Sequence, residues 1–78
     1  MKAKEIRSLK KRKKRIDWLR LARTYFHIGN ANHDLKKFSK AEPWYREAIE
    51  IRKRFYGETN IYVANVYNNY GQTLFYLQ

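Results

Sequence analysis

Apolar residues recur at helical spacing along three successive stretches of the chain. The first stretch, residues 17–34, carries apolar or small residues at intervals of three and four, namely Trp18, Ala22, Tyr25 and Gly29, with Leu21 and Ile28 beside them. This period of about 3.6 residues is typical of an amphipathic helix with one buried face. Because glycine is costly inside a helix, Gly29 on the apolar face indicates that another helix crosses closely at that point.

The second stretch predicts a helix that begins near Ser39 and ends at Gly57. Ser39 is followed three residues later by Glu42, which is the pattern of a capping box. Pro43 then falls in or near the first turn, where a missing N–H does least harm. Gly57 is typical of the residue just beyond a helix end. The apolar face repeats at helical spacing through Ala41, Tyr45, Ala48 and Phe55, with Ile51 adjoining.

The third stretch predicts a helix over residues 59–78, capped by Thr59 or Asn60. Valine, isoleucine and tyrosine also favour strands, but helical spacing continues unbroken to the end of this stretch and excludes a strand over 61–67. Upstream, residues 1–15 contain no glycine or proline and predict a further helix, either separate or continuous from about residue 3 to 29. The apolar face of the third helix is formed by Val63, Val66, Tyr67, Tyr70, Leu74 and Leu77.

An internal repeat with a period of 42 residues relates the first and third of these helices. The offset aligns identical residues at three positions, Ala22 with Ala64, Tyr25 with Tyr67 and Gly29 with Gly71. After Gly29 the spaced alanine, tyrosine and alanine of the second helix follow at Ala41, Tyr45 and Ala48. This pattern resembles tetratricopeptide repeats, and among them the 42-residue repeats of the kinesin light chain type.

The resemblance implies an all-α fold, with a helix-turn-helix hairpin, one further helix and a basic N-terminal helical extension. The expected units are the extension over residues 1–16, one repeat over 17–58, and the first helix of a second repeat over 59–78. Stacked repeats cover one another's apolar faces, so the last helix is expected to lack its covering helix. We therefore expect the chain to belong to a longer array, or to be completed by another copy or a partner. Asn32 and Lys36 replace a usual aromatic and a usual turn glycine, and we expect both to loosen the first hairpin.

The resemblance also implies a concave groove that binds an extended peptide, lined by the first helix of each repeat. Asparagine suits such a groove because its carboxamide donates and accepts hydrogen bonds at once. Phe26 occupies the position of the family's clamp lysine, which argues against recognition of a C-terminal carboxylate. The alternative is that these polar side chains are simply solvated. The candidate groove residues are Asn30, Asn69, His27, His33, Asn65, Asn68 and Gln72, with Arg23, Asp34, Phe75 and Tyr76 on the same faces.

The same alignment predicts which residues form the core between the helices. They are Tyr25, Ile28, Gly29, Ala41, Tyr45, Ala48, Tyr67 and Gly71.

Positive charge is concentrated at the N-terminus. The net charge is +11, and residues 1–23 hold eleven Lys and Arg against two acids, which leaves +9 there and +2 over residues 24–78. A run of six cations suits a solvated face, contact with nucleic acid or another polyanion, a nuclear-import signal, or an anionic membrane surface. The run contains no aromatic residue for base stacking, so sequence-specific recognition is not predicted. It consists of Lys10, Lys11, Arg12, Lys13, Lys14 and Arg15.

No arrangement of side chains in the sequence indicates catalysis, a metal site or a cofactor. The chain has no cysteine, and His27 and His33 are six residues apart with no third ligand in view. Ser39 is better explained as a helix cap than as a nucleophile. No apolar run approaches the roughly 20 residues that span a bilayer, and no secretory signal is present. We expect an intracellular protein, cytoplasmic or nuclear, that is not an enzyme and needs no cofactor.

The sequence therefore predicts a protein–protein interaction or scaffold module that binds a peptide or partner protein in its groove. A second hypothesis is a basic structural subunit that contacts nucleic acid or another polyanion through residues 2–23. A third is a repeat fragment that self-associates through residues 67–77.

Overall fold

Three helices, each antiparallel to the next along the chain, form the part that the computed structural model describes, residues 14–78. They are α2 (Arg15–Asp34), α3 (Phe38–Tyr56) and α4 (Ile61–Leu77), and no strand occurs among these residues. The all-α prediction is confirmed. The expected helix over residues 1–15 lies outside the described residues, apart from Lys14, the N-cap of α2, and Arg15, at which α2 begins.

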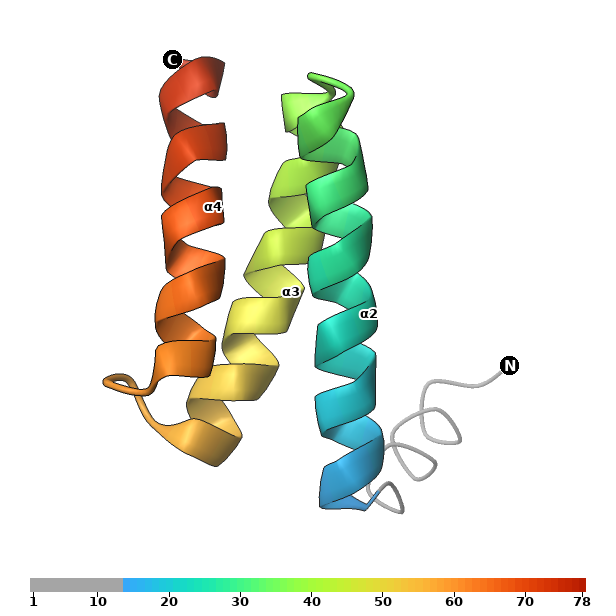
Figure 1. Cartoon of the computed structure of the whole chain (residues 1–78), viewed down its shortest axis with the longest axis vertical. Helices are drawn as coiled ribbons and strands as arrows, with labels where there is room; N and C mark the ends of the chain where they lie inside the picture. The colour runs from blue at the N-terminus through green and yellow to red at the C-terminus, as the bar shows by residue number, and fades with distance from the viewer. Residues whose placement is uncertain (1–13) are drawn as a thin grey trace, which may run out of the picture.

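The central helix, α3, packs against both of the others. Its two neighbours, α2 and α4, run parallel to each other and touch only slightly (Figure 1). Small residues on α3 let both helices approach closely, while Tyr45 fills the space between them. The fully buried apolar residues are Ala22 from α2, Ala41, Tyr45 and Ala48 from α3, and Val63 and Val66 from α4.

Gly29 lies where the ring of Tyr45 crosses α2. A Cβ atom added at Gly29 would lie 2.8 Å from both Cδ1 and Cε1 of that ring. Such a distance is far shorter than the van der Waals contact of two carbon atoms. The close crossing that the glycine indicates in the sequence is therefore present, and it is made by an aromatic ring.

The two faces of α4 differ from the prediction. Val63 and Val66 are buried against α3, together with Thr73, which the apolar pattern does not include. Tyr67 is 43% exposed, and a Cβ atom at Gly71 would meet nothing within 4 Å. The assignment of Tyr67 and Gly71 to the core was thus wrong for residues 14–78, because no described helix covers that side of α4.

The start of α3 also differs from the prediction. Lys37, not Ser39, is the N-cap, and it makes no side-chain capping bond. Its carbonyl accepts hydrogen bonds from the backbone N–H groups of Lys40 and Ala41, so Ser39 is already inside the helix. We attribute the earlier start to Phe38, whose ring stacks on Tyr76 of α4 at a centroid distance of 4.6 Å.

The end of α3 and the start of α4 agree with the sequence, whereas α2 begins at Arg15, two residues before the expected start. Asn60 caps α4, because its Oδ1 atom accepts a hydrogen bond from the backbone N–H of Tyr62 at 2.8 Å. Helix α3 ends at Tyr56, and Gly57 follows with φ +82°, a conformation that side-chain-bearing residues rarely adopt.

Lys36 occupies a left-handed position in the turn between α2 and α3, with φ +60°. The backbone N–H of Lys37 donates to the carbonyl of Asn32, and that of Lys36 donates to the carbonyl of His33. These two bonds form a Schellman motif, in which glycine is the usual residue at the left-handed position. The hairpin closes in the ordinary way, but with lysine in a strained conformation.

Replacing Lys36 with glycine is expected to raise the free energy of unfolding by about 1 kcal/mol, because it removes the left-handed strain of a residue with a Cβ atom. The Lys36 side chain is exposed, so little packing is lost. Urea denaturation followed by circular dichroism would measure the gain. Lys37→Gly is the matched control, since Lys37 has φ −92°, and we expect it to destabilise. A loss of stability for Lys36→Gly would contradict the prediction.

Candidate binding groove

Asn30 and Asn69 join α2 to α4 at the middle of the side where these helices run parallel. The Asn69 Nδ2 group donates to Asn30 Oδ1 at 2.8 Å. The Tyr45 hydroxyl donates to the same oxygen at 2.6 Å, from the buried side. Asn30 Oδ1 thus accepts two hydrogen bonds, and Asn30 anchors the central ring of the core.

The environment of the Tyr45 hydroxyl keeps it protonated. Burial raises the pKa of Tyr45 to about 12, the negative charge of Asp34 acts in the same direction, and the Asn69 side chain acts against them. A neutral hydroxyl is a donor, which matches the short bond to Asn30. The link between the core and the groove is therefore maintained throughout the neutral pH range.

A second polar link between α2 and α4 involves His33. Its Nδ1 atom lies 2.9 Å from Thr73 Oγ1, and that hydroxyl donates its single hydrogen to the carbonyl of Asn69. Thr73 can then only accept from the histidine, so we assign the proton of the neutral imidazole to Nδ1. Sequence reasoning missed Thr73 because threonine on an otherwise apolar face carries no distinct signal.

The candidate groove residues fall into two groups. Three of them are half-buried and tied into the links just described: Asn30, Asn69 and His33. The other four are exposed and make no hydrogen bond to another described residue: His27, Asn65, Asn68 and Gln72. The structure thus separates residues that hold the helices from residues that face solvent.

A hollow of about 340 Å³ opens at one end of the same side, between the N-terminal halves of α2 and α4 and the C-terminal half of α3. We call it the arginine hollow, and it is lined by Leu19, Arg23, Arg52, Tyr56 and Tyr62.

Arg52 is only 8% exposed, and its guanidinium lies against aromatic rings at the base of the arginine hollow. Its Nη1 group donates to the carbonyl of Tyr62 at 2.9 Å, and its Cζ atom lies 5.0 Å from the centroid of Phe26. Burial lowers the pKa of Arg52, nearby Arg23 lowers it further, and Tyr56 and Tyr62 act in the opposite direction. Sequence reasoning missed Arg52, although a charge at the next helical interval after Ala48 was a signal available in the sequence.

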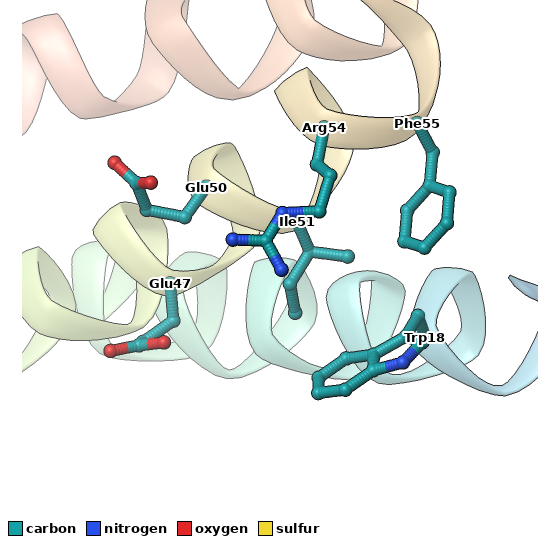
Figure 2. A pocket seen from close by; sticks show the side chains of 6 residues that line it. All are labelled: Trp18, Glu47, Glu50, Ile51, Arg54 and Phe55. Carbon is teal, nitrogen blue, oxygen red and sulfur yellow. The ribbon is translucent and has the colours of Figure 1, made fainter. Parts of the chain in front are cut away.

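A hollow of about 400 Å³ lies along α4, lined by Tyr67, Asn68, Gly71, Gln72, Phe75 and Tyr76, and two further hollows lie elsewhere on the molecule. One, of about 410 Å³, is at the opposite end of α2 and α4, and is lined by His33, Asp34, Lys36, Phe38 and Tyr76. The other, of about 260 Å³, lies between α2 and α3. Figure 2 shows the aromatic ring of Trp18 across this space from Phe55, with the carboxylates of Glu47 and Glu50 farther along α3.

Neither a metal cluster nor a membrane-spanning helix is found in residues 14–78. No group of three His, Cys, Asp or Glu side chains is placed there to hold a metal ion. None of the three helices combines the length and the apolar character that a membrane crossing requires.

Comparison with known proteins gives one match. The family model described as tetratricopeptide repeat matches residues 8–78, which is nearly the whole chain. No curated protein and no solved structure matches the chain.

Proposed function

The chain belongs to the tetratricopeptide repeat family, and on that basis we propose that it binds an extended peptide of a partner protein in the groove between α2 and α4. Repeats of this family generally mediate protein–protein interaction and scaffolding. The proposal narrows this general role to one surface of this chain. It describes a binding module without catalytic activity.

The observation that carries the proposal is the set of exposed amides beside the Asn30–Asn69 link. Asn65 and Gln72 lie one turn before and nearly one turn after Asn69 on α4, and His27 lies one turn before Asn30 on α2. An amide donates and accepts together, which suits the alternating N–H and C=O groups of an extended backbone. The two helices thereby offer a row of matching groups, while Asn30 and His33 keep the helices together.

The test is to select peptides from a random displayed library against the whole chain and to measure their affinities by calorimetry. The variant His27→Ala/Asn65→Ala/Gln72→Ala should bind the selected peptides about tenfold more weakly or worse, since each lost hydrogen bond costs roughly 0.5–1.5 kcal/mol. Circular dichroism should be unchanged, because these side chains are exposed.

The control is Glu47→Ala/Glu50→Ala, which alters exposed polar residues on α3 outside the groove. Equal affinity of the groove variant and the wild type would refute the groove assignment. Asn30 is not used in this test, because its loss would also disturb Tyr45.

We propose assembly through the uncovered face of α4 as a second candidate function. Ala22 and Gly29 are buried against α3, whereas Ala64 and Gly71, at the equivalent repeat positions of α4, are exposed. A second copy that packs there would cover exposed apolar side chains, and Gly71 would allow close approach. The uncovered face comprises Ala64, Tyr67, Gly71 and Leu74.

Light scattering at low and high salt is expected to show a dimer whose mass does not depend on salt. The substitution Leu74→Lys should shift that dimer towards monomer, because Leu74 is 40% exposed on the uncovered face and a charge there would be desolvated in the dimer. The control is Ile61→Lys, which changes a 68% exposed residue outside the face. A monomer in the wild type at micromolar concentration would exclude this candidate.

Contact of residues 2–23 with nucleic acid or another polyanion is the remaining proposal. Lys14 and Arg15 are the members of the cationic run that lie within the described residues, and both are exposed. Arg15 is directed to its own chain, since its Nη2 group lies 3.5 Å from the carbonyl of Phe55. Lys10, Lys11, Arg12 and Lys13 lie outside the described residues. Mass gained with RNA at low salt in the same light-scattering experiment would support this proposal.

A further inference from the structure

Arg52 is a buried cation that has no acidic partner among the described residues. The ion pairs in residues 14–78 are Arg46 with Glu42 and Lys53 with Glu58, and neither includes Arg52. Burying a charge is costly unless it is paired and hydrogen-bonded. Burial lowers the pKa of Arg52, and Arg23, a cation that lines the same hollow, lowers it further. The arginine hollow is therefore a place of unbalanced positive charge.

The surroundings hold the guanidinium in a fixed orientation. The rings of Phe26 and Tyr62 lie at 5.0 and 5.9 Å from its Cζ atom, and the carbonyl of Tyr62 accepts from Nη1. No buried side-chain nitrogen or oxygen in the described residues lacks a hydrogen-bond partner. The Arg52 nitrogens that bond nothing in residues 14–78 are therefore not fully buried, and Arg52 is one of the residues that line the hollow.

A held guanidinium with free N–H groups at the edge of a cavity has the geometry of an anion receptor. Carboxylates and phosphates match the two parallel N–H groups of arginine, and such charge-assisted bonds are about twice as strong as neutral ones. Arg23 supplies a second cation from α2, and the tyrosines at positions 56 and 62 supply rings and hydroxyl groups around the anion. An anion there would offset the repulsion between the two arginines.

We propose that the arginine hollow binds a carboxylate or phosphate group of the peptide that lies in the groove. Arg52 would form two parallel hydrogen bonds to the anion, and Arg23 would be its second cationic partner. The location on the peptide rests on the proposed function, because the hollow lies between α2 and α4, the helices of the groove. Binding of the anion itself does not depend on the peptide.

Nuclear magnetic resonance titration of the whole chain with inorganic phosphate, and separately with acetate, tests the anion site. The chain has a net charge of +11, so the ionic strength is kept constant with chloride. The screening of the chain's charges by salt then stays the same throughout the titration. We expect saturable shifts of the Arg52 Nε–H signal and the Tyr62 amide. Saturation by phosphate alone would assign the site to phosphorylated residues, and saturation by acetate to acidic side chains or a C-terminus.

Arg23→Gln should weaken anion binding about tenfold, because a hydrogen bond to a charged group is worth roughly 1.5–3 kcal/mol. Arg54→Gln removes the same charge from an exposed residue of α3 outside the hollow, and should leave binding unchanged. Arg52→Met should abolish the shifts. If Arg52→Met loses its helical circular dichroism, Arg23→Gln alone decides. Shifts that do not saturate, or that weaken equally in Arg54→Gln, would overturn the proposal.

Peptides selected on the groove separate this proposal from the proposed function. They should contain an acidic residue whose change to glutamine or asparagine weakens binding to the wild type more than it weakens binding to Arg23→Gln. Peptides that bind both proteins equally, without saturable anion shifts, would refute the anion site and leave the groove intact. Saturable phosphate or acetate binding, without any selected peptide, would refute the groove and retain the anion site on its own.

Discussion

Replacing Tyr45 with alanine is expected to lower the free energy of unfolding by about 3–5 kcal/mol, the cost of removing a large aromatic side chain from a core. Tyr45 is fully buried, and its ring lies 6.1 Å from that of Phe26 and 6.5 Å from that of Tyr70. Tyr45 lies near the middle of α3, in the core that all three helices share. The total free energy of unfolding of a chain this short is only about 5 kcal/mol or slightly more. The variant should therefore be largely unfolded at room temperature.

Far-ultraviolet circular dichroism and urea denaturation would measure this loss. Phe75→Ala is the matched control, since Phe75 is an aromatic residue of α4 that is 69% exposed, and its removal should change stability by about 0.5 kcal/mol or less. Tyr45→Phe separates the ring from the hydroxyl, and should cost roughly 0.5–1.5 kcal/mol by removing one of the two hydrogen bonds that Asn30 Oδ1 accepts. A folded, cooperative Tyr45→Ala variant would show that the core is centred elsewhere.

Gly29→Ala is expected to destabilise the chain by roughly 1–3 kcal/mol, although alanine is the better helix former by about 1 kcal/mol. The new methyl group would overlap the Tyr45 ring, at 2.8 Å from two of its carbons. The ring has little room to move, because it is fully buried and its hydroxyl is bonded to Asn30. The steric cost therefore exceeds the gain in helix propensity.

Gly71→Ala is the internal control for this prediction. Gly71 holds the same repeat position in α4, but an added Cβ atom there would meet nothing within 4 Å. This variant should be more stable by up to about 1 kcal/mol, since only the helix propensity changes. Thermal melts of the two variants should thus shift in opposite directions. A shift in the same direction would mean that the two glycines have equivalent surroundings.

The repeat pattern predicted the helices because periodicity is a local property of sequence. Ala22, Ala41 and Ala48 recur at helical intervals, and each is fully buried in the structure. Burial also depends on which helix lies opposite, and identical repeat residues therefore have different exposures. Tyr25 and Tyr67 are tyrosines at equivalent positions of the repeat. Only Tyr25 packs against the buried core cluster, whereas Tyr67 is 43% exposed. A pattern within one helix carries no information about that difference.

Polar contacts were the least predictable part of the candidate site. Asparagine at position 30 suggested a ligand contact, which stays a prediction, whereas the structure shows that its side-chain oxygen accepts hydrogen bonds from Tyr45 and Asn69. Those partners are 15 and 39 residues away in sequence. The prediction that Ser39 caps α3 came from a local motif, and it was wrong because Lys37 is the N-cap. We attribute the difference to the packing of Phe38 against Tyr76, which a local motif does not reveal. The sequence also offered one signal that was overlooked. Arg52 lies at a helical interval from Ala48, and a charged residue at that place on the apolar face indicates a buried cation.

The links between α2 and α4 have a mechanical consequence. These two helices touch only slightly, and Asn30–Asn69 and His33–Thr73 are the side-chain hydrogen bonds that join them within the described residues. Hydrogen bonds are directional and short in range, whereas apolar contacts tolerate small rolls of one helix over another. These two hydrogen bonds therefore restrict how α4 can rotate or tilt relative to α2. If the proposed peptide engages Asn69, we expect it to compete with the bond to Asn30 and so to change the orientation of α4 relative to α2.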